Sequence, residues 1–490
     1  MSMKQIADWA LNTVNLRGAQ YADVRIVDFR QRDLSTKNGK VGKANSSESL
    51  GIGIRVLVDD AWGFASTDEL TRDAVDRTAE QAVQIARASA RVKEEPVRLA
   101  PEPAAKIEWS SPCKIDPFTT SLEENLDLLT RIDHELLVVK GVTMAESNMH
   151  FGRYEQWFYS TGGSDIHQTR FTTGAGFSAL SFQGTEIQKR SFPNSFGGQY
   201  QNKGYELIGE LRLLENARRI GEEAVALHQA DQCPQGKMTL VLGSSQLGLQ
   251  IHESIGHPIE LDRVLGMEAN FAGTSFLTLD KLRTLRYGSG LVNVVADATE
   301  PHGPGLGTYA YDDEGVQGQC TPIITNGLFT GYISSRETAH TIGENRSNGT
   351  MRAEGWNRIP LIRMTNISIL PGEQPLTLEQ LLADTGEGVF METNRSWSID
   401  DKRYNFQFGC EIGWEIKGGK LGRMLKNPSY SGITTEFWNS MDAICSRDQW
   451  TLWGTPNCGK GQPMQTMGTG HGAAPARFRG VTVGTAYKGK

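Results

Sequence analysis

Residues 142–192 form a series of short β-prone runs separated by glycines, and this pattern constrains the fold more than any other. The runs are rich in aromatic and β-branched residues, and each ends in turn-forming residues. We therefore expect a meander of short antiparallel strands in this segment. The 54 glycines of the whole chain likewise favour turns and β-rich regions over a helical bundle.

Helical patterns flank these strands. Apolar residues recur at helical spacing over the first 20 residues, which predicts an amphipathic N-terminal helix. The run 68–90 is predicted to be a long helix opened by a capping box, Ser66 with Glu69. A second capping box, Ser121 with Glu124, predicts the start of another helix.

The length of 490 residues exceeds that of one typical hydrophobic core, so we expect two domains. The first half mixes helices and strands, whereas the second half is strand-rich. The predicted fold class is therefore α+β, with an N-terminal α+β domain at residues 1–232 and a C-terminal β-rich domain at 233–490.

Charge and hydropathy narrow the range of partners and locations. The net charge of −7 gives no reason to expect a nucleic-acid partner, because such proteins usually present a basic face. No apolar stretch approaches the roughly 18 residues that span a bilayer, and the first residues do not read as a signal peptide. Six scattered cysteines favour reduced thiols. We expect a cytoplasmic protein without membrane contact.

Residues 251–262, IHESIGHPIELD, resemble the zinc-binding pattern H-E-x-x-H with one extra residue. In a regular helix, His252 and His257 lie about 140° apart, too far for both imidazoles to reach one ion. Gly256 is conformationally permissive, and Pro258 disfavours continuation of the helix. A widened, π-like turn at this point would return His257 to nearly the same face as His252.

The spacing leaves the remaining ligands open. A catalytic zinc site needs a third protein ligand, and Glu260, Asp262, a distant acidic residue or any of the six cysteines qualifies. Cys458 stands out because turn residues and a lysine surround it, and a nearby lysine favours the thiolate. The alternative is that both histidines are structural and that no metal binds.

Several motifs occur together in the order found in one known family. They are IHESIGHPIELDR, YDDEGVQGQCTPIITNGLFTGYI, RMTNISILPG and NCGKGQP. On these motifs the chain resembles TldD/PmbA metallopeptidases, and specifically the TldD-type, motif-bearing subunit. The resemblance implies that His252, His257 and Cys458 bind Zn²⁺ and that Glu253 is the general base. The segment 392–408 departs from the family pattern.

The resemblance also implies an activity. We expect a cytoplasmic metallopeptidase that hydrolyses unfolded or extended peptides with a zinc-activated water, whose proton Glu253 would take and pass to the leaving amine. Dimers are expected, either homodimers or heterodimers with a related motif-less subunit. The alternative is a non-catalytic dimeric binding or partner subunit with a structural metal. Structural zinc has four protein ligands, and the three found here favour catalysis.

Three further features allow two interpretations each. The acidic turn with Asp312 and Glu314 either supports a ligand histidine or is a solvated turn. His302 and His471 are predicted to lie in flexible, glycine-rich loops, where each either stabilises a tetrahedral intermediate or has no catalytic role.

Overall fold

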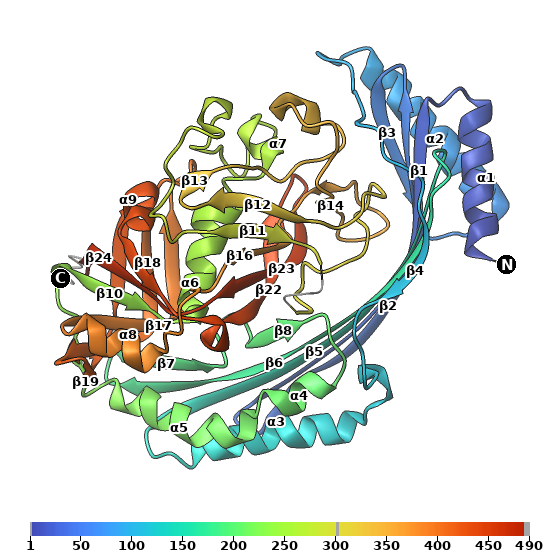
Figure 1. The fold of residues 1–490 in the computed structure, drawn as a ribbon. Helices are drawn as coiled ribbons and strands as arrows, with labels where there is room; N and C mark the ends of the chain where they lie inside the picture. Colours follow the sequence, from blue (N-terminus) through green and yellow to red (C-terminus); the bar gives the residue numbers. More distant parts are fainter. Residues whose placement is uncertain (1, 300–302, 485–490) are drawn as a thin grey trace.

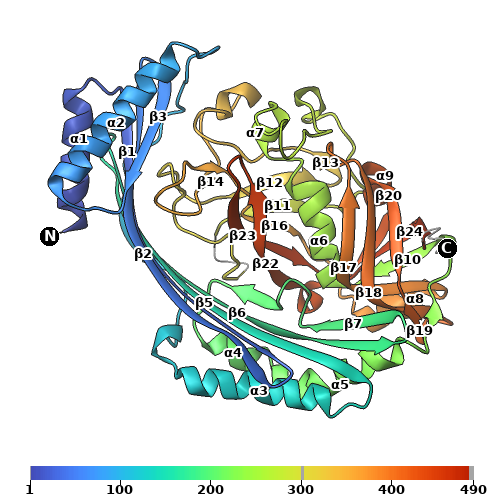
Figure 2. The same cartoon turned by 180° about the vertical axis from the view of Figure 1, so that it is seen from behind.

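The computed structural model describes residues 2–299 and 303–484 and has the predicted α+β fold (Figure 1). A long, curved sheet forms the N-terminal part, and a β-rich body lies against its concave face. Seen from behind, the same sheet wraps around one side of the body (Figure 2). His302 lies outside the described residues, so its predicted role stays a prediction.

The curved sheet is mostly antiparallel and has the strand order β3-β2-β1-β5-β6-β4, with β7 and β8 also paired to β6. Its strands are β1 (Tyr21–Lys37), β2 (Lys40–Val58), β3 (Ala61–Thr67), β4 (Lys106–Ser110), β5 (Val142–Ser160), β6 (Asp165–Gln183), β7 (Glu186–Phe192) and β8 (Gln199–Gln201). Helices cover its convex face near both ends (Figure 1). They are α1 (Met3–Leu16), α2 (Arg72–Ala90), α3 (Leu122–Leu137), α4 (Glu206–Glu210) and α5 (Leu213–Ala226), with a 3₁₀ turn η1 (Pro117–Thr119).

The predicted meander is antiparallel, but the prediction of short strands was wrong. β5 and β6 are each 19 residues long, and glycines such as Gly174 and Gly176 lie inside β6. A Cβ atom at Gly174 would come within 1.9 Å of the Tyr200 ring, and one at Gly176 within 2.4 Å of the Gly198 backbone. These glycines therefore mark a close approach of another segment and not turns.

One of the two predicted helix starts is confirmed. The Ser121 side chain accepts the Glu124 N–H at 3.3 Å at the start of α3. The other was wrong, because α2 begins at Arg72 and its N-cap is Thr71. Ser66 cannot cap this helix, since it belongs to β3 and pairs with β2.

The C-terminal body contains two larger sheets and a short strand pair. One sheet comprises β9 (Asp231–Gln232), β10 (Gly236–Leu242), β17 (Gly388–Ile399), β18 (Asn405–Lys417), β19 (Lys420–Lys426), β20 (Ser429–Ile433), β21 (Met441–Ile444) and β24 (Ala476–Val483). The other comprises β11 (Val294–Asp297), β12 (Cys320–Thr325), β13 (Leu328–Phe329), β16 (Asn366–Ile369), β22 (Thr451–Lys460) and β23 (Gln465–Ala473). The short pair is β14 (Met351–Arg352) with β15 (Leu361–Ile362).

Helical segments in the body are short. They are α6 (Ser244–Ile251), a π-helical segment η2 (His252–Gly256), α7 (Leu261–Val264), α8 (Leu378–Thr385), α9 (Thr434–Asn439), and the 3₁₀ turns η3 (Leu279–Lys281), η4 (Ala339–Ile342) and η5 (Arg447–Gln449). α6 lies between the two larger sheets of the body (Figures 1 and 2) and is buried along its length. This position places the predicted metal-binding segment in the middle of the body.

The apolar core has one large cluster in the body and two smaller clusters in the N-terminal part. One of the smaller clusters packs α1 and α2 against one end of the curved sheet, for example through Val24 and Ala79. The other packs α3 and α5 against the opposite end, for example through Phe151 and Ile220. Burial of apolar surface thus fixes both ends of the long strands separately.

Buried charge joins the curved sheet to the body. Arg55 of β2 pairs with Asp23 at 2.6 Å and with Glu314 at 3.0 Å, and all three side chains are buried. Asp312 accepts backbone N–H groups of residues 314, 316 and 351. Both interpretations of the acidic turn were wrong, because it is neither solvated nor bonded to a predicted ligand histidine.

No helix among the described residues is long and apolar enough to cross a membrane. The division of the chain between residues 232 and 233 remains a proposal. The first strand in a sheet of the body is the two-residue β9, at residues 231 and 232, and β10 follows at Gly236.

Candidate metal centre

The helix that carries His252 widens into a π-helix where the sequence predicted such a turn. α6 continues into η2 without a break, and the His257 N–H donates to the His252 carbonyl oxygen at 3.1 Å, five residues earlier. This bonding brings the two imidazole rings onto one side, with their centroids 4.9 Å apart.

Gly256 makes this turn possible through tight packing. A Cβ atom at Gly256 would lie 2.2 Å from the Met364 sulfur, and Met364 is buried. The backbone of Gly256 has an ordinary negative φ, so its role is to leave room and not to adopt a left-handed conformation. After Pro258 the chain leaves the helix, and Glu260 forms an isolated bridge with Ile333.

Cys458 approaches the two histidines from β22, about 200 positions further along the chain. Its sulfur lies 3.9 Å from the Nε2 atom of His257. One potential ligand atom from each of His252, His257 and Cys458 lies within 4.8 Å of the others, and all three residues are buried. Two imidazole nitrogens and one thiolate sulfur form a donor set that suits zinc.

His471 is buried within β23, so the prediction of a flexible loop at this residue was wrong. Its hydrogen bonds fix which nitrogen of His252 faces the cluster. His471 donates from Nδ1 to the Ile367 carbonyl at 3.2 Å, so its Nε2 accepts from Nδ1 of His252 at 2.7 Å. Burial lowers the pKa of His471 well below its usual value, consistent with a neutral acceptor. The Nε2 lone pair of His252 is thereby left for a metal ion.

His257 is oriented in a similar way by a carboxylate. Its Nδ1 donates to Oε2 of Glu260 at 3.0 Å, which leaves Nε2 on the side of Cys458. Burial opposes ionisation of Glu260, but Lys460, His257 and Arg263 outweigh it and hold its pKa well below the usual value. Glu260 is therefore a carboxylate that orients a predicted ligand, and is not placed as a ligand itself.

The thiolate form of Cys458 is favoured by an arginine and not by the lysine that follows it. Burial opposes ionisation of this thiol, but Arg363 and His257 outweigh it and lower its pKa. The Lys460 ammonium instead donates to Asp262 at 2.7 Å and to the Ile362 carbonyl at 2.8 Å. The prediction that this lysine supports the thiolate was wrong, because its ammonium group bonds Asp262 and Ile362, whereas Arg363 and His257 stabilise the thiolate.

Glu253 lies next to His252 on the π-turn and pairs with Arg403 of the β17–β18 loop, with 2.5 Å between Oε2 and Nη1. Arg403 has a positive φ of 64°, and the turn that holds it is closed by Asp400, which accepts the Tyr404 N–H at 2.7 Å. Arg403 belongs to the segment that departs from the family pattern. Sequence reasoning missed it, because no local signal joins residues 150 positions apart.

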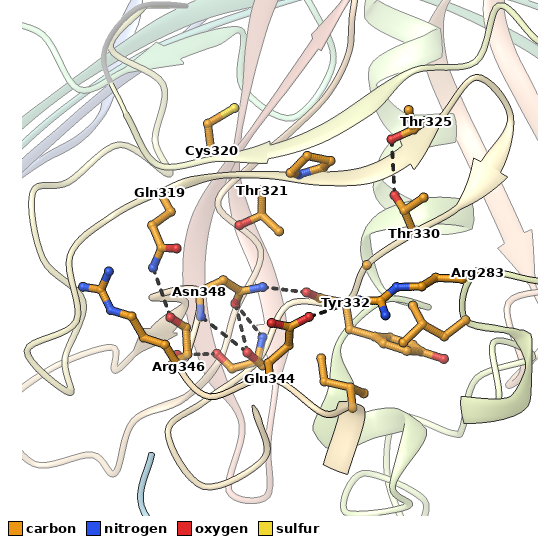
Figure 3. Close-up of a pocket in the computed structure, with 16 residues that line it drawn as sticks. Arg283, Gln319, Cys320, Thr321, Thr325, Thr330, Tyr332, Glu344, Arg346 and Asn348 are labelled. Carbon is orange, nitrogen blue, oxygen red and sulfur yellow. Dashed lines mark hydrogen bonds and ion pairs between the residues drawn. The ribbon is translucent and has the colours of Figure 1, made fainter. Parts of the chain in front are cut away.

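A separate cavity of about 480 Å³ lies beside β12 (Figure 3), and none of the four predicted site residues lines it. Its charged groups are paired, as Arg283 is with Glu344 at 3.2 Å. Its cysteine, Cys320, has a pKa raised to about 11, mainly by burial, which disfavours a nucleophilic thiolate. We place no chemistry in this cavity.

Comparison with known families assigns the chain. Residues 22–86 match the PmbA/TldA metallopeptidase domain 1, and residues 235–485 match the PmbA/TldA metallopeptidase C-terminal domain. The chain belongs to the TldD/PmbA metallopeptidase family. It is thus a metallopeptidase, as the motifs around His252 and Cys458 predicted.

Curated members of the TldD/PmbA family align with nearly the whole chain. A metalloprotease of Methanocaldococcus jannaschii is 29% identical over 460 residues, covering 93% of this chain and 96% of that protein. A metalloprotease TldD homolog of Buchnera aphidicola is 27% identical, and the alignment covers 92% of this chain and 89% of that protein. A zinc metalloprotease TldD homolog of Saccharolobus solfataricus is 22% identical, and the alignment covers 87% of this chain and 89% of that protein.

Solved structures share the fold of this TldD/PmbA protein. A putative modulator of a DNA gyrase from Thermotoga maritima superposes with a TM-score of 0.77 at 17% identity, covering 99% of this chain and all of the other. TldE from Thermococcus kodakarensis superposes with a TM-score of 0.71 at 15% identity, covering 99% of this chain and 100% of the other. These similarities establish the architecture of the curved sheet and the body.

Proposed function

We propose that this TldD/PmbA protein is a zinc-dependent peptidase that hydrolyses unfolded or extended peptides. The ligands would be His252, His257 and Cys458, with Glu253 as general base. The observation that carries the proposal is the convergence of two oriented histidines and a cysteine of lowered pKa beside Glu253. The name of the Saccharolobus relative as a zinc metalloprotease supports the choice of metal.

Each of these residues has a definite task in hydrolysis. A zinc ion bound here would supply a Lewis acid that polarises the scissile carbonyl and acidifies water. Glu253 accepts the proton of the attacking water and passes it to the leaving amine. Arg403 donates a hydrogen bond to Glu253 and so fixes the direction of this carboxylate.

The alternative is a non-catalytic dimeric subunit with a structural metal. A structural zinc is enclosed by four protein ligands. Among the described residues, the group around His252 contains three, and Glu260 is already bonded to His257 and Arg263. A fourth position left for water or substrate supports catalysis.

Assembly and location complete the proposal. We propose a dimer, formed either by two copies of this chain or with a related motif-less subunit. The likeness of the fold to TldE is compatible with either arrangement. A peptide or unfolded protein as substrate, no nucleic-acid partner and a cytoplasmic location remain proposals from the sequence.

The test combines metal content with peptide hydrolysis for wild type, Glu253→Ala and Cys458→Ser, each purified without chelators. We expect one zinc per chain and hydrolysis for wild type. Glu253→Ala should keep the zinc and lose at least about a hundredfold in kcat, in line with the loss of a general base. Cys458→Ser should lose zinc and activity together.

Two results would overturn this proposal. Purified wild-type protein without stoichiometric metal would contradict the proposed metal centre. A Glu253→Ala variant with full activity would leave Glu253 without a role in proton transfer, whatever its metal content.

A further inference from the structure

A second cavity, of about 290 Å³, lies where the concave face of the curved sheet meets the body. Phe29 of β1 and Tyr154 of β5 line it from the sheet, and Pro456 and Met467 line it from β22 and β23. Met467 is also the backbone partner of Cys458 across this strand pair. The cavity and the predicted metal centre thus share two strands.

Hydrogen-bond donors without partners gather around this cavity. The buried Arg352 donates from Nη1 to the Gly468 carbonyl at 3.0 Å, but its Nε has no hydrogen-bond partner among the described residues. The Tyr154 hydroxyl is also buried and has no hydrogen-bond partner in residues 2–299 and 303–484. The Arg170 guanidinium lies over the Tyr154 ring at 4.4 Å and makes no ion pair with the residues that the structure describes. Unsatisfied buried donors are costly, so a ligand that accepts them would be bound tightly.

The positive charge of the cavity is poorly compensated. Burial and the neighbouring Arg170 and Arg363 lower the pKa of Arg352 to about 10, which reflects a cation with too little negative charge around it. The nearby Asp313 is engaged elsewhere, since it accepts the Ala353 N–H at 2.6 Å and lies 3.5 Å from Arg25. Among the described residues that line the cavity, the one carboxylate is that of Glu354, which is an exposed residue.

We propose that this cavity is an anion subsite in which Arg170, Arg352 and Tyr154 bind a carboxylate of the peptide substrate. A carboxylate offers several acceptor positions for the donors that lack partners. Its negative charge would also compensate the positive charge of the two arginines. Pro456 lies two residues before Cys458 on β22, which corresponds to roughly 7 Å of extended chain. The identity of the ligand as a peptide rests on the proposed peptidase function.

The test uses isothermal titration calorimetry to measure binding of unlabelled, N-acetylated peptides to the full chain carrying Glu253→Gln, which removes the proposed general base. One neutral sequence is made as the C-terminal acid, as the C-terminal amide, and as the amide with a single internal Glu. We expect a carboxylate-bearing peptide to bind about tenfold more tightly than the neutral amide, as expected for a charge-assisted hydrogen bond. The acid and the internal Glu distinguish an α-carboxylate from a side chain.

Variants then locate the carboxylate. Arg170→Gln and Tyr154→Phe should reduce this preference to less than about threefold, whereas the surface control Arg131→Gln should keep it. Arg352→Gln is avoided, because Arg352 also bonds the Gly468 and Met364 carbonyls and the variant could misfold. Equal affinities for the three peptides, or a preference that survives Arg170→Gln, would overturn the inference.

Hydrolysis by wild type separates the two proposals. If wild type cleaves peptides but the Glu253→Gln chain shows no carboxylate preference in binding, the subsite inference alone is wrong. If the preference depends on Arg170 and no peptide is cleaved, the anion subsite stands and the peptidase proposal fails.

Discussion

The backbone N–H of His257 donates to the carbonyl oxygen of His252, five residues earlier, at 3.1 Å. This single bond accounts for the extra residue between the two histidines. A regular helix would direct their side chains about 140° apart, whereas the π-turn places both beside Cys458. The longer spacing is therefore a requirement of this local geometry.

Gly256→Ala should distort this turn. The new methyl group would meet the buried Met364 sulfur at 2.2 Å, and overpacking of this kind costs about 2 kcal/mol of unfolding free energy. We also expect weaker zinc binding, because His257 is the next residue. Urea unfolding and a zinc competition titration measure the two effects. Gly209→Ala, where a Cβ atom would meet no neighbour, is the matched control. Full stability and unchanged affinity in Gly256→Ala would contradict the packing argument.

His471→Phe tests whether His471 positions His252. Phenylalanine keeps an aromatic ring but cannot accept from the Nδ1 of His252, so the tautomer is no longer fixed. We expect zinc affinity to fall by about 10- to 100-fold. The same substitution at the exposed His340 should leave the affinity unchanged. Equal zinc affinity in His471→Phe and wild type would show that His471 has no positioning role.

Glu260→Gln should destabilise the body. Glu260 is buried among Arg263, Lys460 and His257, and loss of its charge leaves two buried cations with less compensation. Removal of one partner from a buried ionic group costs about 3–5 kcal/mol. Denaturant unfolding should show this loss, while Glu344→Gln, in an exposed pair, should change stability by less than about 0.5 kcal/mol. Comparable small changes in both variants would contradict this account.

Asp33, which lies away from the metal centre, makes the stability of the fold depend on pH. Hydrogen bonds from His150 and Lys43 outweigh burial and lower its pKa from 3.8 to about 2. Since the folded-state pKa is the lower one, the carboxylate stabilises the fold above pH 3.8, and this contribution is lost as the pH falls toward 2. After allowance for solvent screening, Asp33→Asn should cost about 1 kcal/mol at pH 6 and less at pH 3. A difference that does not change between pH 6 and pH 3 would contradict the assignment.

The sequence predicted those parts of the site that depend on local backbone chemistry. Pro258 indicated an end to the regular helix, because it changes the backbone within one or two residues of itself. The flexibility of Gly256 also pointed to a widened turn, although its role in the structure is to leave room for Met364. Cys458 was only one of several possible ligands on spacing alone, and it was selected by the family resemblance. The structure brings its sulfur to 3.9 Å from the Nε2 atom of His257.

The sequence did not predict contacts between distant segments. Arg403 reaches Glu253 from the loop between β17 and β18, and His471 reaches His252 from β23, and both β17 and β23 pack against α6. Their residue types carry no local signal for this packing. The same limit explains the strand lengths, since Gly174 resembled a turn residue but leaves room for Tyr200.

The most direct test of the central claim is X-ray absorption at the zinc edge of the purified wild-type protein. Coordination by His252, His257 and Cys458 predicts one sulfur at about 2.3 Å together with nitrogen or oxygen scatterers at about 2.0–2.1 Å, including two imidazoles. The sulfur contribution should disappear in any zinc retained by Cys458→Ser. A wild-type spectrum without sulfur, or one with four sulfurs, would contradict the proposed centre.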